Sequence, residues 1–415
     1  MEVSDPKTTL LKHPLQKIKN LPRAYWHLSS LEFLYWFASA IGSYLTVFLQ
    51  RQGFRADQIG LLYAVNSSIS ILSTPFWGMM ADKTKSIRKI LIFCILTGII
   101  LWAMVPVSFR IAPVLIYFVI FTGVFLRAPI GSLFDAFVVQ RADNERVTFS
   151  HVRLWGSFSY AVMSFSLSRI LPRTGVEISF YMYGIFFLPF VFMLWKTKGS
   201  DEKRFPGRRT FRSMGFGRLF RNYYFITFLV LYFLIQISMS SNGSFLPILI
   251  NATGSDAARL GIIGGYSALL EIPMLFLIRP LRRRLPLPIT ICGGVLLLSL
   301  GTFLYSIAGS LSQIVLIQTL HGLGNGLLIG SITSYVYSLS PDGLNSTALT
   351  MCGAAAATAS IIGNSAGGLL IVVLGVHRFY LVSSFVLVFA LALFIVTLVI
   401  GIRVLKKPVY STVSF

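Results

Sequence analysis

Two charged residues stand within apolar stretches of this chain. Asp135 lies near the end of one long apolar segment, and Arg153 lies just inside the start of the next, after a short polar turn. Charges are costly in such surroundings and are usually paired or functional. If the two segments pack antiparallel, the side chains come close. They then form either a salt bridge that only holds two helices together, or a carboxylate and a planar guanidinium that hydrogen-bond a polar solute.

Aromatic and basic side chains accompany this pair. Trp155 and Tyr160 follow Arg153. Their rings can stack on the apolar face of a sugar or on another ring, although aromatic residues in apolar segments more often pack or face lipid. Arg127 precedes Asp135 by two helical turns on roughly the same face, so it either joins the pair or extends to the membrane surface. All of these residues are candidate solute ligands.

Two further residues have the chemistry needed to move a proton. Glu271 lies in the middle of an apolar segment with no cation near it in the sequence. A carboxyl group that changes its protonation with its surroundings is what proton coupling requires. His321 can relay a proton or hydrogen-bond the solute, but a lone His on a helix is also often a packing residue. Glu32 lies near the end of its segment, where it can simply reach the interface.

The composition identifies the elements that must position these groups. Of the 415 residues, 55% are hydrophobic and 12% are charged, whereas soluble proteins carry about 25% charged residues. Apolar runs of about 20 residues, long enough to cross a bilayer, recur along the whole chain. We therefore expect an all-α polytopic membrane protein with twelve transmembrane helices. The expected spans are 25–50, 58–80, 88–109, 112–139, 149–171, 176–197, 221–250, 258–279, 288–308, 312–339, 345–372 and 379–404.

The charge distribution indicates the orientation. The net charge of +22 comes from short basic clusters between the apolar runs, which is typical of cytoplasmic loops facing anionic lipid rather than of a nucleic-acid-binding protein. Most Lys and Arg residues fall on the face that also holds both termini. We expect a multi-pass protein of the plasma or inner membrane with both termini cytoplasmic. The polar first 24 residues are typical of a cytoplasmic tail rather than a signal peptide.

An internal repeat divides the spans six and six. The sequence Ile59-Gly60-Leu61-Leu62 is similar to Leu260-Gly261-Ile262-Ile263, and Ile130-Gly131-Ser132 recurs as Ile329-Gly330-Ser331. Both matches have an offset of about 200 residues, which favours two pseudo-symmetric six-helix bundles. The charges at Asp135 and Arg153 have no equivalents in the second half. The expected parts are a tail (1–24), a first bundle (25–197), a basic linker (198–220), a second bundle (221–404) and a tail (405–415).

Over its whole length the chain resembles the major facilitator superfamily. The superfamily's loop motif after the second span is similar to Gly78-Met79-Met80-Ala81-Asp82-Lys83 followed by Arg88-Lys89. By this resemblance Gly78, Asp82, Lys83 and Arg88 belong to a loop that takes part in conformational change. Lys85 stands where the motif usually has Gly after its Asp-Lys pair.

Within the superfamily the chain is most similar to the lactose-permease and phenylpropionate-permease group of oligosaccharide:proton symporter-like proteins. The similar stretches are Asp135-Ala136-Phe137, Val152-Arg153-Leu154-Trp155-Gly156-Ser157 and Gly42-Ser43-Tyr44, the last also like nucleoside permeases. The resemblance implies that Asp135 and Arg153 bind a sugar, that Tyr160 replaces a stacking Trp, and that Tyr44 joins them. Glu271 and His321 match an acid in the eighth span and a His in the tenth.

Two charges of the lactose-permease pattern are missing. The acid three residues after the His is Gly324 here, and no cation lies between Thr290 and Ser306. Glu271 therefore carries the proton with a different partner, or transport is uncoupled. 

The sequence thus predicts a secondary active transporter that works by alternating access, with proton-coupled uptake of a small sugar or glycoside. The alternatives are a proton-linked or uncoupled carrier of an aromatic carboxylate or nucleoside and, more remotely, a solute sensor that does not transport. We find no nucleophile–base pair or metal-ligand spacing, and the three Cys residues lie in apolar segments, so we expect no enzyme, metal or cofactor. The expected partners are a solute, protons and the bilayer, and the expected state is a monomer.

Overall fold

The computed structural model describes residues 23–145, 147, 149–197, 219–282, 285–341 and 344–405. Apart from a few residues at their edges, the two expected tails and the expected linker lie outside this part of the chain. The described residues form helices that coincide with the expected spans to within a few residues.

The first half contains six helical segments within the described residues. They are α2 (Arg23–Ser39) continued by η2 (Ala40–Tyr44) and α3 (Leu45–Arg51), α4 (Ala56–Thr84), α5 (Ile87–Ile111), α6 (Leu115–Arg127) continued by α7 (Ile130–Asn144), α8 (Phe149–Thr174) and α9 (Ile178–Lys196).

The second half contains the other six. They are α11 (Tyr223–Ala252), α12 (Leu260–Arg282) preceded by the short η4 (Ala257–Arg259), α13 (Leu287–Tyr305), α14 (Leu311–Leu339), α15 (Asn345–Leu374) and α16 (Val376–Val399) continued by the π-helical turn η5 (Ile400–Val404).

Local sequence explains several boundaries. Pro129 separates α6 from α7, because proline has no backbone N–H and clashes with the preceding turn. Ser86 caps α5 by accepting a hydrogen bond from the Lys89 backbone N–H at 3.3 Å, and such caps satisfy N–H groups that a helix start leaves free. Gly375 links α15 to α16 with a φ of 85°, a conformation that glycine adopts without strain.

Ten of the segments in the described part of the chain are long and apolar enough to cross a membrane. The two others are α8 and α12. Helix α8 is less apolar because it carries Arg153, Arg169, Arg173 and several serines. Such polar helices are tolerated in membranes when they face the protein interior or a cavity. The chain is therefore an all-α, multi-pass membrane protein.

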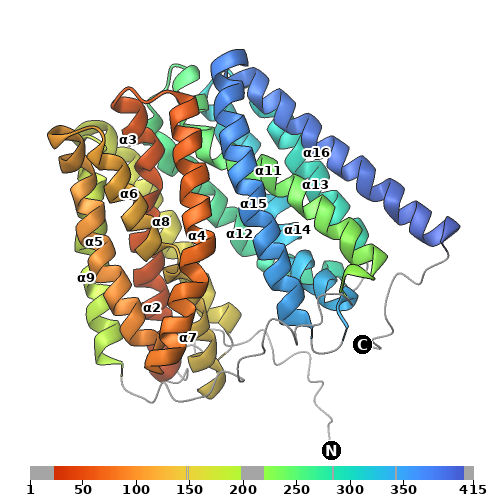
Figure 1. Ribbon diagram of the computed structural model, residues 1–415, viewed down its shortest axis with the longest axis horizontal. Helices are drawn as coiled ribbons and strands as arrows, with labels where there is room; N and C mark the ends of the chain where they lie inside the picture. Colours follow the sequence, from red (N-terminus) through yellow and green to blue (C-terminus); the bar gives the residue numbers. More distant parts are fainter. Residues whose placement is uncertain are drawn as a thin grey trace, which may run out of the picture.

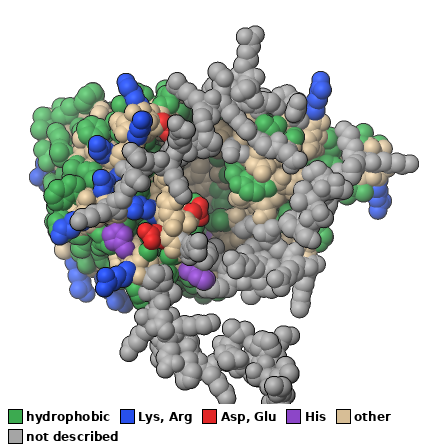
Figure 2. Space-filling model, turned by 90° about the horizontal axis from the view of Figure 1, so that it is seen from below, with side chains coloured by type: hydrophobic (Ala, Val, Ile, Leu, Met, Phe, Trp, Pro, Cys, Tyr) green, Lys and Arg blue, Asp and Glu red, His purple; other side chains and the backbone are tan. Residues whose placement is uncertain are grey.

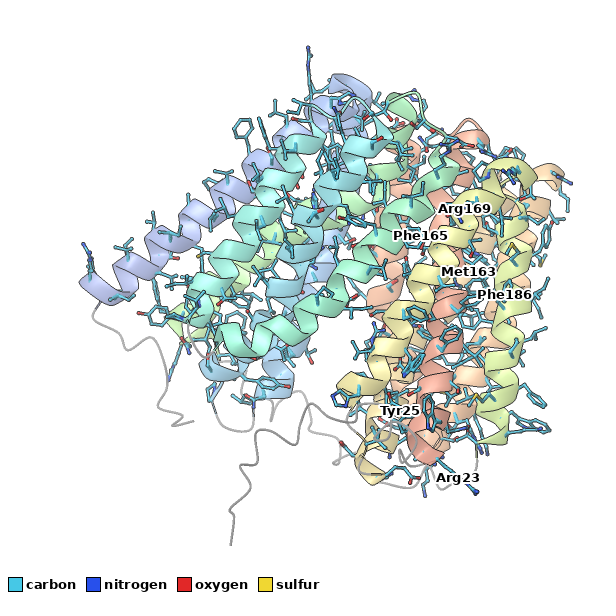
Figure 3. All side chains as sticks on the ribbon, turned by 180° about the vertical axis from the view of Figure 1, so that it is seen from behind. Arg23, Tyr25, Met163, Phe165, Arg169 and Phe186 are labelled. Atoms are coloured by element: carbon cyan, nitrogen blue, oxygen red, sulfur yellow. The ribbon has the colours of Figure 1, made fainter. Side chains whose placement is uncertain are left out.

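The halves meet in two symmetric helix pairs. Helix α4 packs against α15, and α8 packs against α12 (Figure 1). The first pair joins the second span to the eleventh, and the second pair joins the fifth span to the eighth. Because the second span corresponds to the eighth and the fifth to the eleventh, exchanging the two halves converts one pair into the other. At the second interface, Phe165 of α8 fills the space beside Gly265 of α12 (Figure 3). The arrangement agrees with the pseudo-symmetry expected from the internal repeat.

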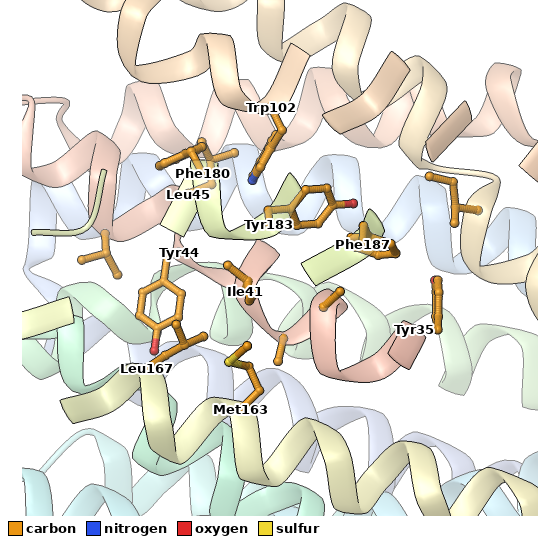
Figure 4. Packing of buried hydrophobic residues seen from close by; sticks show 14 of the residues in the cluster. Tyr35, Ile41, Tyr44, Leu45, Trp102, Met163, Leu167, Phe180, Tyr183 and Phe187 are labelled. Carbon is orange, nitrogen blue, oxygen red and sulfur yellow. The ribbon is translucent and has the colours of Figure 1, made fainter. Parts of the chain in front are cut away.

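The two ends of the molecule differ. We call the end where α2 begins and η5 ends the terminal end, and the opposite end the far end. One large apolar core fills the first half (Figure 4) and continues at the far end into the second half through Phe245, Leu249 and Phe379. A separate core occupies the terminal end of the second half, around Phe228 and Tyr335. The bundles therefore converge at the far end and diverge toward the terminal end (Figure 1).

Candidate functional site

A cavity of about 420 Å³ lies between the two halves. The first half contributes Trp36, Tyr44, Arg153 and Tyr160 from η2 and its neighbours α2 and α8, together with serine hydroxyls. The second half contributes Glu271 of α12 and Gln318 of α14. Seen from the terminal end, the molecule is hollowed near the middle, between the two bundles (Figure 2). Volumes of about 300–1,000 Å³ are typical of sites for small molecules.

Arg153 is held on the wall of the cavity by a carboxylate and an aromatic ring. Its guanidinium lies 3.9 Å from the centroid of the Trp36 ring, a cation–π contact. Its Nη1 lies 3.9 Å from Oε2 of Glu32. A Cβ on Gly156 would lie 2.5 Å from Trp36 Cδ1, 2.8 Å from Arg153 Nη1 and 3.0 Å from Glu32 Oε2. Glycine at position 156 therefore allows these three side chains to meet.

Glu32 is the ion-pair partner of Arg153, and its side chain is fully buried, with 0% exposure. The interpretation that Glu32 simply reaches the interface is therefore wrong. Asp135 interacts electrostatically with both Arg153 and Glu32. However, Asp135 does not line the cavity, and within the described residues it makes no ion pair with Arg153 shorter than 4.0 Å. In place of the expected pair of Asp135 and Arg153, the structure therefore has a cluster of three charged residues, Glu32, Asp135 and Arg153.

The predicted aromatic ligands separate into two groups. Tyr160 lines the cavity, shares a hydrogen bond of 3.3 Å with the Ser43 hydroxyl, and lies edge-on to Trp36. Tyr44 also lines the cavity, buried at the interface with α12. Trp155 lies outside the lining, because its indole N–H donates to the Tyr25 hydroxyl at 3.1 Å toward the terminal end.

The second half places one of the two predicted proton-coupling residues in the cavity. Glu271 belongs to the lining. His321 does not: it is buried between α13 and α14, with its ring stacked on Tyr305 at a centroid distance of 4.8 Å. The Tyr305 hydroxyl donates to the side-chain oxygen of Gln318, which does line the cavity. Among the described residues, this chain of side chains links His321 to the site.

Arg127 has a separate environment. Its guanidinium lies 3.7 Å from the centroid of Trp102 and 4.6 Å from that of Tyr183, and its Nε donates to the Tyr183 hydroxyl at 3.1 Å. Trp102 and Tyr183 lie close together in the core of the first half (Figure 4). Arg127 neither lines the cavity nor extends to the membrane surface. It is packed among α5, α6 and α9.

The loop motif connects helices at the terminal end. Lys85 ends α4 with a φ of 52°, the left-handed conformation that glycine adopts most easily, so it occupies the position where the motif usually has Gly. Asp82 and Lys83 are exposed. Arg88 donates to the Thr197 carbonyl at the end of α9, which satisfies a helix terminus. Gly78 has no atom within 4 Å of the position its Cβ would take.

The far end is closed by contacts between the halves that the sequence analysis did not find. Arg51 forms an ion pair with Asp256 at 3.0 Å. The Asn251 amide donates to the Gln50 side chain at 3.3 Å, and the Thr46 hydroxyl donates to the Ser244 carbonyl at 3.1 Å. These partners are about 200 residues apart, so no local pattern predicts them.

Trp36, Glu32 and Gln318 were also missed as members of the site. For Trp36 and Glu32 a signal existed, since they are four residues apart and hence on one face of a helix. Among the described residues there is no group of three or more His, Cys, Asp or Glu side chains arranged to hold a metal ion.

Comparison with known proteins agrees with the fold. The model of the MFS_1 like family matches residues 25–382. The chain is 25% identical over 369 residues to the uncharacterized transporter YwbF of Bacillus subtilis (strain 168), covering 86% of this chain and 88% of the relative. It is 22% identical over 342 residues to the maltose permease of Geobacillus stearothermophilus, covering 81% and 82%. The crystal structure of the nucleoside transporter NupG superposes with a TM-score of 0.76 at 16% identity, covering 91% and 99%, which shows the shared fold.

Proposed function

This chain belongs to the MFS_1 like family, whose members are transporters rather than enzymes, and we propose that it carries a small sugar or glycoside together with a proton. The observation that carries the proposal is the position of Arg153. It lies beside Trp36 and Tyr160 and opposite Glu271 and Gln318, while its own charge is already balanced by Glu32.

The arrangement of the halves supports alternating access. The cavity lies between two bundles that contact each other across the far end, and the bundles diverge toward the terminal end. Transporters with this symmetry expose a central site to one side at a time by rocking one bundle against the other. We propose that the terminal end is cytoplasmic, from the distribution of Lys and Arg, and hence that the structure is the state open to the cytoplasm.

The charges favour a neutral solute. One cation, Arg153, stands among three acids, namely Glu32, Asp135 and Glu271. A carboxylate solute would bring a further negative charge into this acid-rich medium of low dielectric, where like charges repel strongly. A sugar instead offers hydroxyl groups that accept from Arg153 and donate to Glu271, and an apolar ring face for Tyr160 or Trp36. The aromatic-carboxylate alternative is therefore less favoured than a sugar.

A nucleoside is also neutral and has a ring for stacking, so it is the alternative to be tested. The similarity to a maltose permease supports the sugar, whereas the likeness to NupG concerns the fold.

We test the solute with purified protein in liposomes. Uptake is measured for a panel of mono- and disaccharides, aryl glycosides, nucleosides and phenylpropionate, with and without an imposed proton gradient. We expect a sugar or glycoside to accumulate, to compete with its analogues and to depend on the proton gradient. Uptake of nucleosides without competition by any sugar would show that the solute class is nucleosides instead of sugars. Accumulation that does not depend on the proton gradient would refute proton coupling.

The variant Arg153→Met serves as the site control, because it keeps much of the side chain's bulk and removes the guanidinium. We expect it to abolish binding while the protein remains folded. Unchanged affinity in Arg153→Met would reduce the Arg153–Glu32 pair to a bridge between helices.

A further inference from the structure

The cluster around Arg153 contains more negative than positive charge. Glu32 of α2 and Asp135 of α7 both interact with the single guanidinium of Arg153 from α8. Arg153 is ionised under all ordinary conditions. If both acids were ionised as well, the cluster would hold one uncompensated negative charge inside the membrane.

The contacts within the cluster are incomplete. Glu32 has no exposed side-chain surface. The Trp36 side chain acts on Glu32 as a hydrogen-bond donor, but it does not reach either carboxylate oxygen closely enough to form a well-aligned bond. Among the described residues, both oxygens of Glu32 lack such a partner, as do Asp135 Oδ1 and Arg153 Nη1. The Glu32–Arg153 distance of 3.9 Å is longer than a hydrogen bond. A buried ion pair is stable only when additional hydrogen bonds satisfy its remaining atoms, so this cluster as it stands is poorly compensated.

Among the described residues, no other charged group acts on Glu32. Helix α2 packs against α7, α8 and α9. The charged groups that act on Glu32 are Asp135 from α7 and Arg153 from α8. Helix α9 places the rings of Phe187 and Phe190 against α2 at Tyr35. Two acids, of which Glu32 is fully buried, therefore compete for one cation, and like charges placed in this way cannot both ionise freely.

We propose that Glu32 and Asp135 share one bound proton beside Arg153, and that this is the proton bound together with the solute when the solute binds to Arg153. The assignment rests on the proposed function for the solute, and it names the group that couples the proton. Glu271, which faces the cavity, is then a solute ligand, and its sequence-predicted role in coupling becomes the alternative outcome.

The coupling follows from linkage between two binding events. When solute oxygens accept the donors of Arg153, the guanidinium compensates the two acids less well, and their affinity for the proton rises. Reciprocally, a proton on the pair releases Arg153 toward the solute. The two effects must be equal in free energy. Solute affinity therefore increases as the pH falls through the titration of the pair, which titrates as a unit rather than as two separate residues.

Infrared spectroscopy tests the shared proton directly. The full-length protein in lipid is titrated from mildly acidic to mildly alkaline pH while the carbonyl band of protonated carboxyl groups is followed. We expect the wild type to lose this band during the titration. Glu32→Gln and Asp135→Asn should each lack it, because the acid that remains pairs one-to-one with Arg153. Glu271→Gln is the matched control and should retain it.

Each contrary result overturns the proposal. It fails if the wild type shows no titrating band, if the band persists in both Glu32→Gln and Asp135→Asn, or if Glu271→Gln loses it. If Glu32→Gln does not fold, Asp135→Asn decides, since removing either acid has the same consequence. The infrared result does not depend on the solute, so failure of the sharing and failure of the proposed function are distinguishable.

A binding measurement with a solute found by the uptake panel tests the coupling. In the wild type the dissociation constant should fall with falling pH. In Glu32→Gln the dissociation constant should be independent of pH, and the solute should no longer drive proton uptake. Exchange of solute across the membrane in the absence of a proton gradient should continue. Persistence of proton uptake in Glu32→Gln, together with its loss in Glu271→Gln, would assign the proton to Glu271 instead.

Discussion

Gly368 of α15 is the position where a single methyl group should change the balance between the two open states. A Cβ there would lie 2.5 Å from the Ala56 carbonyl oxygen and 3.1 Å from the Asp57 Cα. These are backbone atoms at the start of α4, in the other half, and real Cβ atoms stay at least about 3 Å from such neighbours. The variant Gly368→Ala therefore requires the halves to separate by roughly 0.5 Å or more at the far end.

The size of the effect follows from the cost of overpacking. Inserting a methyl group into a well-packed place costs about 1–3 kcal/mol. In the state that opens the far end, α4 and α15 are apart and this cost is absent. The ratio of the two states should then change about 5- to 150-fold in favour of the state open at the far end. Helix propensity also favours Ala over Gly, but equally in both states.

Distances between spin labels measure this ratio. Labels are placed on cysteines introduced at Gln52 and Thr253, which lie at the far end on opposite halves, in protein whose own three cysteines are replaced. We expect Gly368→Ala to enlarge the long-distance population. Gly293→Ala is the matched control, since no atom lies within 4 Å of its added Cβ, and it should leave the distribution unchanged. An unchanged distribution in Gly368→Ala would refute the claim that contact at this glycine closes the far end.

Three further predictions concern other contacts. Arg51→Ala or Asp256→Ala should favour opening of the far end by only about 0.2–1 kcal/mol, less at high salt, because the pair is over one-third exposed; a salt-independent effect in the spin-label assay would contradict this. Tyr160→Ala should weaken solute binding, measured by calorimetry, by on the order of 1 kcal/mol. Trp155 lies outside the cavity, so Trp155→Ala should change the binding free energy by less than about 0.5 kcal/mol. Equal effects of the two substitutions would show that Trp155 reaches the solute. Gly156→Ala should lower thermal stability and solute affinity by about 1–3 kcal/mol, because its methyl group collides with the Trp36 ring; a variant with unchanged melting temperature and affinity would show that this close approach is not needed.

The sequence alone determined the class of protein and most of its helices. Composition and apolar runs are sufficient for this, because every backbone polar group inside a bilayer must be bonded within its own helix. The break at Pro129 was not predicted, although proline is a local signal, since the apolar run continues through it. The repeat likewise indicated two symmetric halves, because internal duplication is recorded in the sequence itself.

Four of the residues that we selected from charge and resemblance line one cavity, namely Arg153, Tyr160, Tyr44 and Glu271. Their roles in solute binding and proton coupling stay predictions. Trp155 was chosen by the same reasoning but lies outside the cavity lining, because successive side chains of a helix point to different sides of it. Sequence position alone does not say which of them faces the partner half.

Only the tertiary structure decided which charges meet. Asp135 was expected to pair with Arg153 because the two are close along the chain, yet the ion pair forms with Glu32, more than 100 residues away. Arg51 and Asp256 close the far end across an even longer separation. In a membrane protein both the lipid-facing and the protein-facing sides of a helix are apolar, so periodicity does not identify the buried side. The partners of the few polar groups are therefore fixed by helix packing, and the shared proton that we propose for Glu32 and Asp135 follows from that packing.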